Sequence, residues 1–316
     1  NGVDVYEFRQ VGLADRTVLT NAQGNPVSFG RVTVAGHSLG GHLATAFARL
    51  FPEHTDHVYT YNSAGFHGSS EFRFREYEQG LGKPFGVFPG PNTQTNLYAE
   101  NGFNLTTSDI LFSQQGQRVP VFNEESTLIP NHLIDKLSDS LALYNLFAKL
   151  DPSLTMSQID VLFKAASNQM ANTLEKGLQG LVKLFQNQDL PLSTRDAYYS
   201  ALINLRDDVL FNQSAGLVTV LLTQFLSTST LFDRAKTDIS FRYALQQLNP
   251  FVIAGDDGLY AQHNQNGELA LYDKTTGEGA LTDEYLKDRA AFLAEVIKAN
   301  VTDNAPASGV IQIAGD

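Results

Sequence analysis

The sequence of 316 residues contains no cysteine, and this absence excludes disulfides, thiolate metal sites and cysteine nucleophiles together. It also suits a protein that crosses a secretion channel unfolded. No run of 18 apolar residues occurs, so we expect no transmembrane segment. The longest apolar stretch, SAGLVTVLLTQFL at 214–226, carries polar residues and predicts a buried helix.

Positive charge is scarce as well. The chain has 22 Lys and Arg against 34 Asp and Glu, which gives a formal net charge of −12. Because phosphate binding needs an excess of Lys and Arg, we expect no nucleic-acid partner. The same charge repels an anionic membrane surface, so any contact with a lipid interface should be transient, local and apolar. The apolar fraction of 42% supports a sizeable core.

A strand, a helix and a second strand follow one another early in the chain. RVTVAG (31–36) is β-branched and ends in glycine, which is typical of a buried parallel strand. LGGHLATAFARLF (39–51) has helical spacing, and HVYTYNSAGF (57–66) indicates a strand that ends in small residues. This order predicts a right-handed crossover in a parallel sheet, and hence the α/β class.

The remaining segments suggest two regions. Residues 67–100 are rich in Gly, Pro, Asn and aromatic residues, and we expect an excursion from the core there rather than a core element. Residues 103–116 predict another strand, and residues 132–150 predict an amphipathic helix. We therefore expect an α/β core over 1–150, with a parallel sheet flanked by helices. Residues 151–316 should form a mainly helical region, with a hairpin-like segment near 250–280 and a last helix from 283.

The pentapeptide GHSLG, residues 36–40, matches the pattern G-x-S-x-G. A serine between a strand and a helix lies in a strained turn, where bulky neighbours would clash and glycines are preferred. The helix that begins after Ser38 directs its free N–H groups at the site, and the N–H of Leu39 would stabilise an oxyanion there. The alternative is a glycine-rich connection with an ordinary capping serine.

A serine nucleophile needs a base, and the base needs an orienting acid. His37 and His42 flank the turn, and their side chains cannot easily reach Ser38. His54 and His57 lie beyond the far end of the helix predicted at 39–51. His263 lies in QHNQNG, which predicts a solvated turn. These considerations leave His67 and His132 as candidates for the base.

Chain order favours His132 as the base. Asp109 ends the strand NLTTSD (104–109), at the sheet edge where Ser38 lies, and His132 follows it at the start of a helix. The order Ser38, Asp109, His132 is the one expected for a strand-turn-helix nucleophile. His67 precedes Asp109, so we assign it, with His37, to the substrate pocket.

Two alternatives stay open for the acid. Asp109 could merely cap a turn at the end of its strand. Asp139, on the helix after His132, is the second candidate, although Asp135 and Asp139 by default lie on a solvated helix face.

The segments VTVAGHSLGGHLA, VYTYNSAGF, TTSDIL and NHLIDKLSDSLALYNL together resemble bacterial members of the class 3 lipase group of the α/β-hydrolases. The resemblance covers about residues 31–147. It implies a partial α/β-hydrolase sheet, carboxylic ester hydrolysis and a triad of Ser38, Asp109 and His132. One departure is Leu133, because the family usually has serine after the histidine.

The segments FRYALQQLNPFVIAGDDGLYAQHNQNGELALYDKTTGEG and LTDEYLKDRAAFL resemble parts of large secreted bacterial proteins of the RTX type. This resemblance implies an extracellular location. The nonapeptide that binds calcium in such proteins does not occur in this chain, so calcium would enter only through neighbouring repeats, and we expect no metal or cofactor. GDDG (255–258) could ligate calcium, but a plain turn is favoured.

Only 37 residues precede Ser38, which is few for the strands that come before the nucleophile in such a fold. We therefore expect the N-terminal strands and the second oxyanion donor to be missing from this chain or supplied by another polypeptide.

The expected function is hydrolysis of acyl lipids, as in a lipase or phospholipase. A carboxylesterase or acyltransferase would use the same triad. A non-catalytic, hydrolase-derived module of a large secreted protein is the alternative from a different class. The sequence leaves the oligomeric state open.

Overall fold

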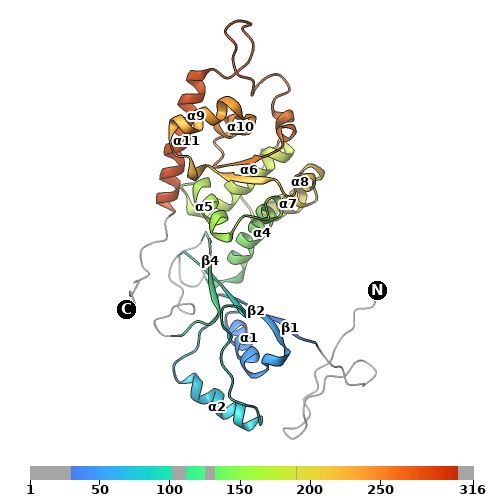
Figure 1. Cartoon of the computed structure of the whole chain (residues 1–316), viewed down its shortest axis with the longest axis vertical. Coiled ribbons are helices and arrows are strands. Elements are labelled where there is room, and N and C mark those ends of the chain that lie inside the picture. The colour runs from blue at the N-terminus through green and yellow to red at the C-terminus, as the bar shows by residue number, and fades with distance from the viewer. Residues whose placement is uncertain (1–29, 102–111, 125–131, 190, 305–316) are drawn as a thin grey trace. The chain divides into compact units, whose positions relative to one another are not determined.

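The computed structural model describes residues 30–101, 112–124, 132–189 and 191–304 (Figure 1). They belong to two compact units, one drawn from Asn1–Leu97 with Thr106–Val119, the other from Tyr98–Leu105 with Pro120–Asp316. Asp109 lies outside the described residues. No helix in these ranges is long and apolar enough to cross a membrane.

The first part of the chain has the α/β architecture that the sequence predicts. A four-stranded sheet has the order β1-β2-β3-β4, and its strands are β1 (Val32–His37), β2 (Thr55–Tyr61), β3 (Gln94–Ala99) and β4 (Gln117–Val121). The pairs β1–β2 and β2–β3 are parallel. Helix α1 (Leu39–Leu50) connects β1 to β2 through the short turn η1 (Pro52–His54) and lies against both strands (Figure 1).

One face of this sheet packs on α1. Val34 and Val58 are partners in the register of β1 and β2, and both pack with Ala44 and Ala48 of α1. On the alternate positions Thr33, Ala35 and Tyr59 are exposed. Because strand residues alternate between faces, these exposed side chains mark the face opposite α1.

The segment 67–100 was expected to be an excursion, and this prediction was wrong for two elements. It contains α2 (Ser70–Gly80) and the strand β3, whose Leu97 and Ala99 are buried. Helix α2 is rich in charge, and only Phe74 and Glu78 of it are buried. The guanidinium of Arg49, which comes from α1, lies over the rings of Phe74 and Phe88.

The second unit is mainly helical. Its α-helices are α4 (Ile134–Leu150), α5 (Met156–Ala166), α6 (Thr173–Gln186), α7 (Arg195–Arg206), α8 (Val209–Gln213), α9 (Thr228–Thr237), α10 (Ile239–Gln247) and α11 (Asp283–Asp303). Short 3-10 turns are η2 (Met170–Asn172), η3 (Leu222–Gln224) and η4 (Asp257–His263). The core is built from leucine and phenylalanine side chains, among them Leu143, Phe147, Phe163, Leu181 and Phe251.

The apolar run at 214–226 does not form the buried helix that we expected. Its centre is the strand β5 (Val218–Leu221), which pairs antiparallel with β6 (Phe251–Ala254). We expected a hairpin within the segment near 250–280. Its strand β6 instead pairs with β5, which precedes that segment. Residues 270–281 form a separate loop, closed by the bridge between Leu271 and Leu281.

Helix α11 closes the second unit by bonding to the end of α5. The Asn300 side chain donates to the carbonyl of Ala165 at 2.8 Å, and that of Asn304 donates to the carbonyls of Lys164 and Ser167. The last carbonyls of a helix have no partner within it, so these two buried asparagines cap α5. The domain boundary predicted near 150 stays a prediction; α4, which ends there, packs against α5, α6 and α7.

Candidate active site

Ser38 lies in the tight connection between β1 and α1, where the sequence pattern places it. Its φ of 54° and ψ of −120° form a strained backbone conformation that residues with a Cβ seldom adopt. The Ser38 N–H donates to the carbonyl of Tyr61 at 3.0 Å. The Ser38 carbonyl accepts the N–H groups of Gly41, His42 and Ala64 at 3.1, 3.2 and 3.3 Å. These four bonds hold the strained conformation from both sides.

Small residues make this turn sterically attainable. A Cβ added at Gly36 would lie 2.2 Å from the carbonyl oxygen of Gly40, and one at Gly41 would lie 2.7 Å from the hydroxyl of Ser63. A Cβ at Gly40 would meet nothing within 4 Å. Two glycines of GHSLGG are therefore required by close packing, and Gly40 is not one of them.

The segment after β2, residues 62–66, is bound to the turn around Ser38. Asn62 also has a positive φ, 45°, and its N–H donates to the carbonyl of Leu97 at 2.9 Å. The Ala64 N–H reaches Ser38, and Phe66 pairs with Ser113. The sequence showed this segment only as small residues at the end of a strand, and their contact with the turn was missed.

The histidines near the turn have different surroundings. His37 is the last residue of β1 and is half-buried. His42 stacks on Phe66 with ring centroids 3.9 Å apart, and its Nδ1 lies 3.2 Å from the Gly65 carbonyl. His67 is exposed, and its Nδ1 accepts the N–H of Ser69 at 3.2 Å. His67 is thus engaged in a local turn, and its assignment to a pocket stays a prediction.

Leu39 is the first residue of α1, as the oxyanion-hole hypothesis requires. The first N–H groups of a helix lack partners within it and carry the positive end of the helix dipole. The Leu39 side chain is 65% exposed, so it does not close the turn off from solvent.

The proposed base lies in the other unit of the chain from Ser38. His132 is half-buried, two residues before α4, and belongs to the second unit. Asp109 lies outside the described residues, so the pairing of Ser38, Asp109 and His132 stays a prediction. The alternative acid Asp139 is occupied: its Oδ1 accepts Nε of Arg195 at 3.1 Å and the Tyr199 hydroxyl at 2.8 Å.

Two turn predictions in the second unit have different outcomes. His263 is not a solvated turn residue, because its Nε2 lies 2.9 Å from the Leu184 carbonyl, its ring packs on Tyr243, and burial lowers its pKa. In GDDG, Asp256 accepts the N–H of Gly258 at 2.9 Å and caps η4, as a plain turn requires. Among the described residues, no group of three His, Asp or Glu side chains could hold a metal.

A buried ionic cluster in the second unit was not foreseen. Lys164 Nζ lies 2.6 Å from Glu100 and 2.7 Å from Asp160, and the Tyr144 hydroxyl bonds to Asp160 at 3.4 Å. Burial raises the pKa of Asp160 to about 6. Asp160 and Lys164 are an i,i+4 pair, but Glu100 and Tyr144 lie far from Lys164 in the sequence, so no local pattern could reveal the cluster.

Comparison of the sequence with models of protein families and with curated proteins gave no match.

Proposed function

We propose that the chain is a serine ester hydrolase that acts on acyl lipids, with Ser38 as nucleophile. The observation that supports this most strongly is the backbone of Ser38, with φ 54° and ψ −120° at a strand-to-helix turn. Strain at such a turn lifts a serine hydroxyl out of the sheet edge and places it at the start of a helix. An ordinary helix-capping serine needs no such conformation, because capping residues have extended dihedral angles.

The reaction has two halves. The Ser38 hydroxyl attacks the acyl carbonyl while His132 takes its proton, and the oxyanion that forms is stabilised by the Leu39 N–H. His132 then gives the proton to the leaving alcohol, and an acyl-serine remains. Water repeats the sequence, and the carboxylic acid leaves. Asp109 orients the imidazole throughout.

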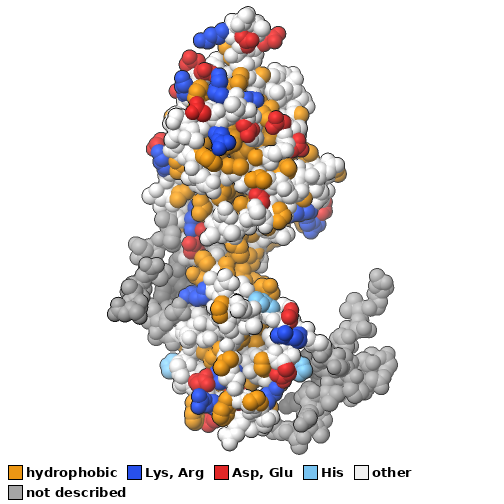
Figure 2. All heavy atoms as spheres, in the orientation of Figure 1, with side chains coloured by type: hydrophobic (Ala, Val, Ile, Leu, Met, Phe, Trp, Pro, Cys, Tyr) orange, Lys and Arg blue, Asp and Glu red, His pale blue; other side chains and the backbone are white. Residues whose placement is uncertain are grey.

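The lipid preference rests on the sequence resemblance and on exposed apolar side chains. Five large apolar residues are more than half exposed on α2 and the segment after it: Phe72, Tyr77, Leu81, Phe85 and Val87. Figure 2 shows such hydrophobic side chains scattered among charged ones over the surface. These side chains would offer apolar contact to an acyl chain or to a lipid interface.

A fluorophosphonate probe tests the proposal, because it reacts only with an activated serine. We expect a covalent adduct at Ser38, located by mass spectrometry. Ser38→Ala should abolish the adduct, and His132→Ala should slow its formation by about 10³-fold or more. His54→Ala is the matched control, because His54 is exposed beyond the end of α1 and should label at the normal rate. A folded protein without adduct would contradict the proposal.

A non-catalytic module is the second candidate, and one observation favours it. Strand β1, which carries Ser38, lies at the edge of the described sheet, and its residues Val32, Thr33 and Ala35 are exposed. A nucleophile on an exposed edge is less shielded from water than one in the middle of a sheet. Absence of probe labelling together with a normal fold would support this candidate.

A further inference from the structure

The ionic cluster of the second unit has two carboxylates for one ammonium group. Nζ of Lys164 lies 2.6 Å from Oε2 of Glu100 and 2.7 Å from Oδ2 of Asp160. Because both oxygens contact the same nitrogen, they can lie no further apart than these two distances together. Asp160 and Lys164 are one turn apart on α5, and Glu100 follows β3. With Tyr144 of α4, these residues are called here the lysine cluster.

The lysine cluster carries one negative charge too many when both acids are ionised. The Tyr144 hydroxyl, 3.4 Å from Oδ1 of Asp160, supplies a hydrogen bond but no charge. The side chains of Lys164, Asp160 and Glu100 are only 9%, 15% and 20% exposed. A buried charge without a counter-charge is costly, and such a group takes up a proton more readily than it does in water.

The lysine cluster joins two paired segments to two helices, all within the second unit. The Glu100 N–H donates to the carbonyl of Val121 at 2.9 Å, so residues after β3 lie beside the end of β4. The Phe122 N–H donates to the Tyr144 hydroxyl at 3.3 Å. Lys164 and Tyr144 thus hold one segment each, from α5 and from α4. Loss of the cluster would free both segments from the helices.

The elements that pack on α5 do not supply the missing positive charge. These elements are α4, α6, α11 and η3. Toward α5, α11 directs the uncharged Asn300 and Asn304, and α6 places Gly177 beside Phe163. η3 contains no charged residue. Lys164 is the cation whose charge acts on Asp160, and Glu100 acts against it.

Charged residues of α6 and of the segment after β4 are engaged elsewhere. Oε1 of Glu124 accepts the N–H of Leu174 at 2.7 Å, at the start of α6. Lys183 pairs with Asp189 at 2.7 Å. The other two charged residues of α6, Glu175 and Lys176, line a pocket described next.

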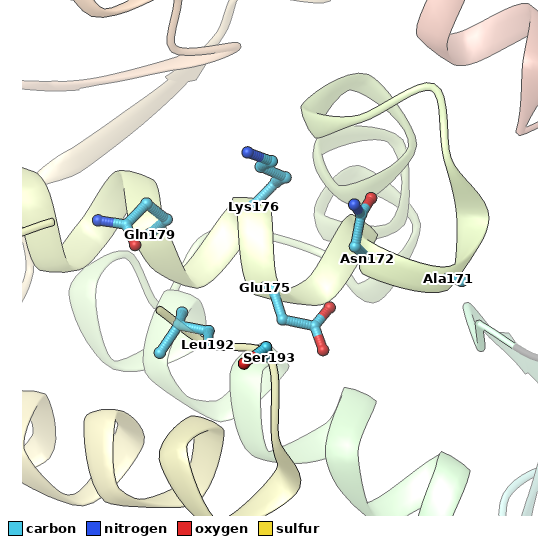
Figure 3. A pocket seen from close by; sticks show the side chains of 7 residues that line it. All are labelled: Ala171, Asn172, Glu175, Lys176, Gln179, Leu192 and Ser193. Carbon is cyan, nitrogen blue, oxygen red and sulfur yellow. The ribbon is translucent and has the colours of Figure 1, made fainter. Parts of the chain in front are cut away.

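A proton suits the lysine cluster better than a metal ion does. A metal ion needs several ligands with space between them. A pocket of about 360 Å³ lies at the start of α6, but no member of the cluster lines it (Figure 3). The residues that line it are Ala171, Asn172, Glu175, Lys176, Gln179, Leu192 and Ser193.

We propose that the lysine cluster takes up one proton on Asp160 at mildly acidic pH, and that this proton tightens the joint between the paired segments and α4 and α5. At neutral pH two carboxylates compete for Lys164 and repel each other. Once Asp160 is neutral, Lys164 and Glu100 remain as a balanced ion pair. This regulation does not depend on the activity proposed for Ser38.

The pH range follows from the direction of the pKa change at Asp160. Burial is the largest cause that raises this pKa to about 6, from an ordinary value of 3.8. The folded chain therefore binds the proton more tightly than the unfolded chain does. The stabilising contribution is fully present below about 3.8 and is lost as the pH rises through about 6. Acidification from pH 7.5 therefore strengthens the joint.

Asp160→Asn tests the charge, because asparagine keeps the shape and is neutral at every pH. The variant should be the more stable protein at pH 7.5. Its unfolding equilibrium constant, divided by that of the wild type, should rise roughly 60-fold as the pH is lowered to 4. Asp288→Asn, at an exposed position of α11, is the matched control and should parallel the wild type. Urea denaturation at each pH measures all three, and parallel profiles would overturn the proposal.

Hydrogen exchange of the unmodified full-length chain provides a test that needs no variant. From pH 7.5 to pH 5, after correction for the intrinsic rate, the peptides that cover residues 98–101 and 120–123 should gain protection about tenfold. The peptide that covers α10 should change less. Unchanged or lower protection of the two segments at pH 5 would contradict the proposal, because the joint would then need both acids in the charged form.

Discussion

At the scale of single residues, the turn around Ser38 shows which part of a sequence pattern carries the structure. The pattern G-x-S-x-G draws attention to Gly36 and Gly40. In the structure the close contacts fall on Gly36 and Gly41, because their missing side chains make room for the carbonyl of Gly40 and for Ser63. Packing thus requires the first and the third glycine of GHSLGG, and not the second.

These contacts predict opposite effects for two similar substitutions. Gly36→Ala forces backbone atoms apart and should lower the free energy of unfolding by about 1–3 kcal/mol. Gly40→Ala meets nothing within 4 Å inside α1 and should be neutral or stabilise by up to about 1 kcal/mol. Urea denaturation monitored by circular dichroism measures both. Equal effects would show that the turn does not pack as described.

At the scale of elements, α2 is attached to α1 by a buried arginine. The Arg49 side chain is fully buried, its Nε donates to Glu78 at 2.8 Å, and its Nη2 donates to Glu71 at 3.0 Å. These bonds, with the hydrogen bond to Glu71 the largest cause, raise the pKa of the guanidinium. The same contact lowers the pKa of Glu71 to about 2. Local hydropathy could not predict α2, because the contact that stabilises this helix comes from another element.

Arg49→Met should therefore release α2. Removal of the guanidinium leaves Glu78 charged and buried, and we expect a loss of about 3–5 kcal/mol in stability. The double variant Arg49→Met, Glu78→Gln should recover part of that loss, because no buried charge remains unpaired. Chemical denaturation of both variants distinguishes this explanation from simple loss of packing, which would make the double variant the worse of the two.

The contact between Arg49 and Glu71 also has a predictable pH dependence. The pKa of Glu71 is lower in the folded state than in the unfolded chain, so its contribution is present above about 4.5 and lost as the pH falls toward 2.

Short elements and long-range partners account for what the sequence could not predict. β1, α1, β2, α4 and α11 follow from periodicity and end signals, and the structure confirms them. β5 was mistaken for a helix because a short apolar run fits either type, and its partner β6 lies 30 residues further on. Ser38 was chosen as candidate nucleophile from neighbouring residues alone, whereas Asp109 and His132 depend on the fold, and all three assignments stay predictions.

At the scale of the whole molecule, net charge limits which surfaces the chain can approach. The formal charge of −12 repels the chain from anionic surfaces at low ionic strength, and added salt screens this repulsion. The exposed apolar side chains of α2 and the segment after it would have to act against this repulsion when the chain meets lipid.

Vesicle flotation checks this balance. We expect less adsorption to anionic vesicles than to zwitterionic ones at low salt, and the difference should disappear at high salt. Phe72→Ser with Phe85→Ser should reduce adsorption to both kinds, because both side chains are more than 60% exposed. Preference for anionic vesicles would mean that a local basic patch outweighs the net charge.

The caps that α11 places on α5 also bear on how the protein is made. Asn300 and Asn304 bond to carbonyls about 135 residues earlier in the chain. During translation α5 leaves the ribosome long before its C-terminal carbonyls meet these asparagines. Contacts between residues so far apart slow folding, and until they form the helices of this unit expose apolar surface. The second unit can therefore complete its folding only after α11 has been synthesised.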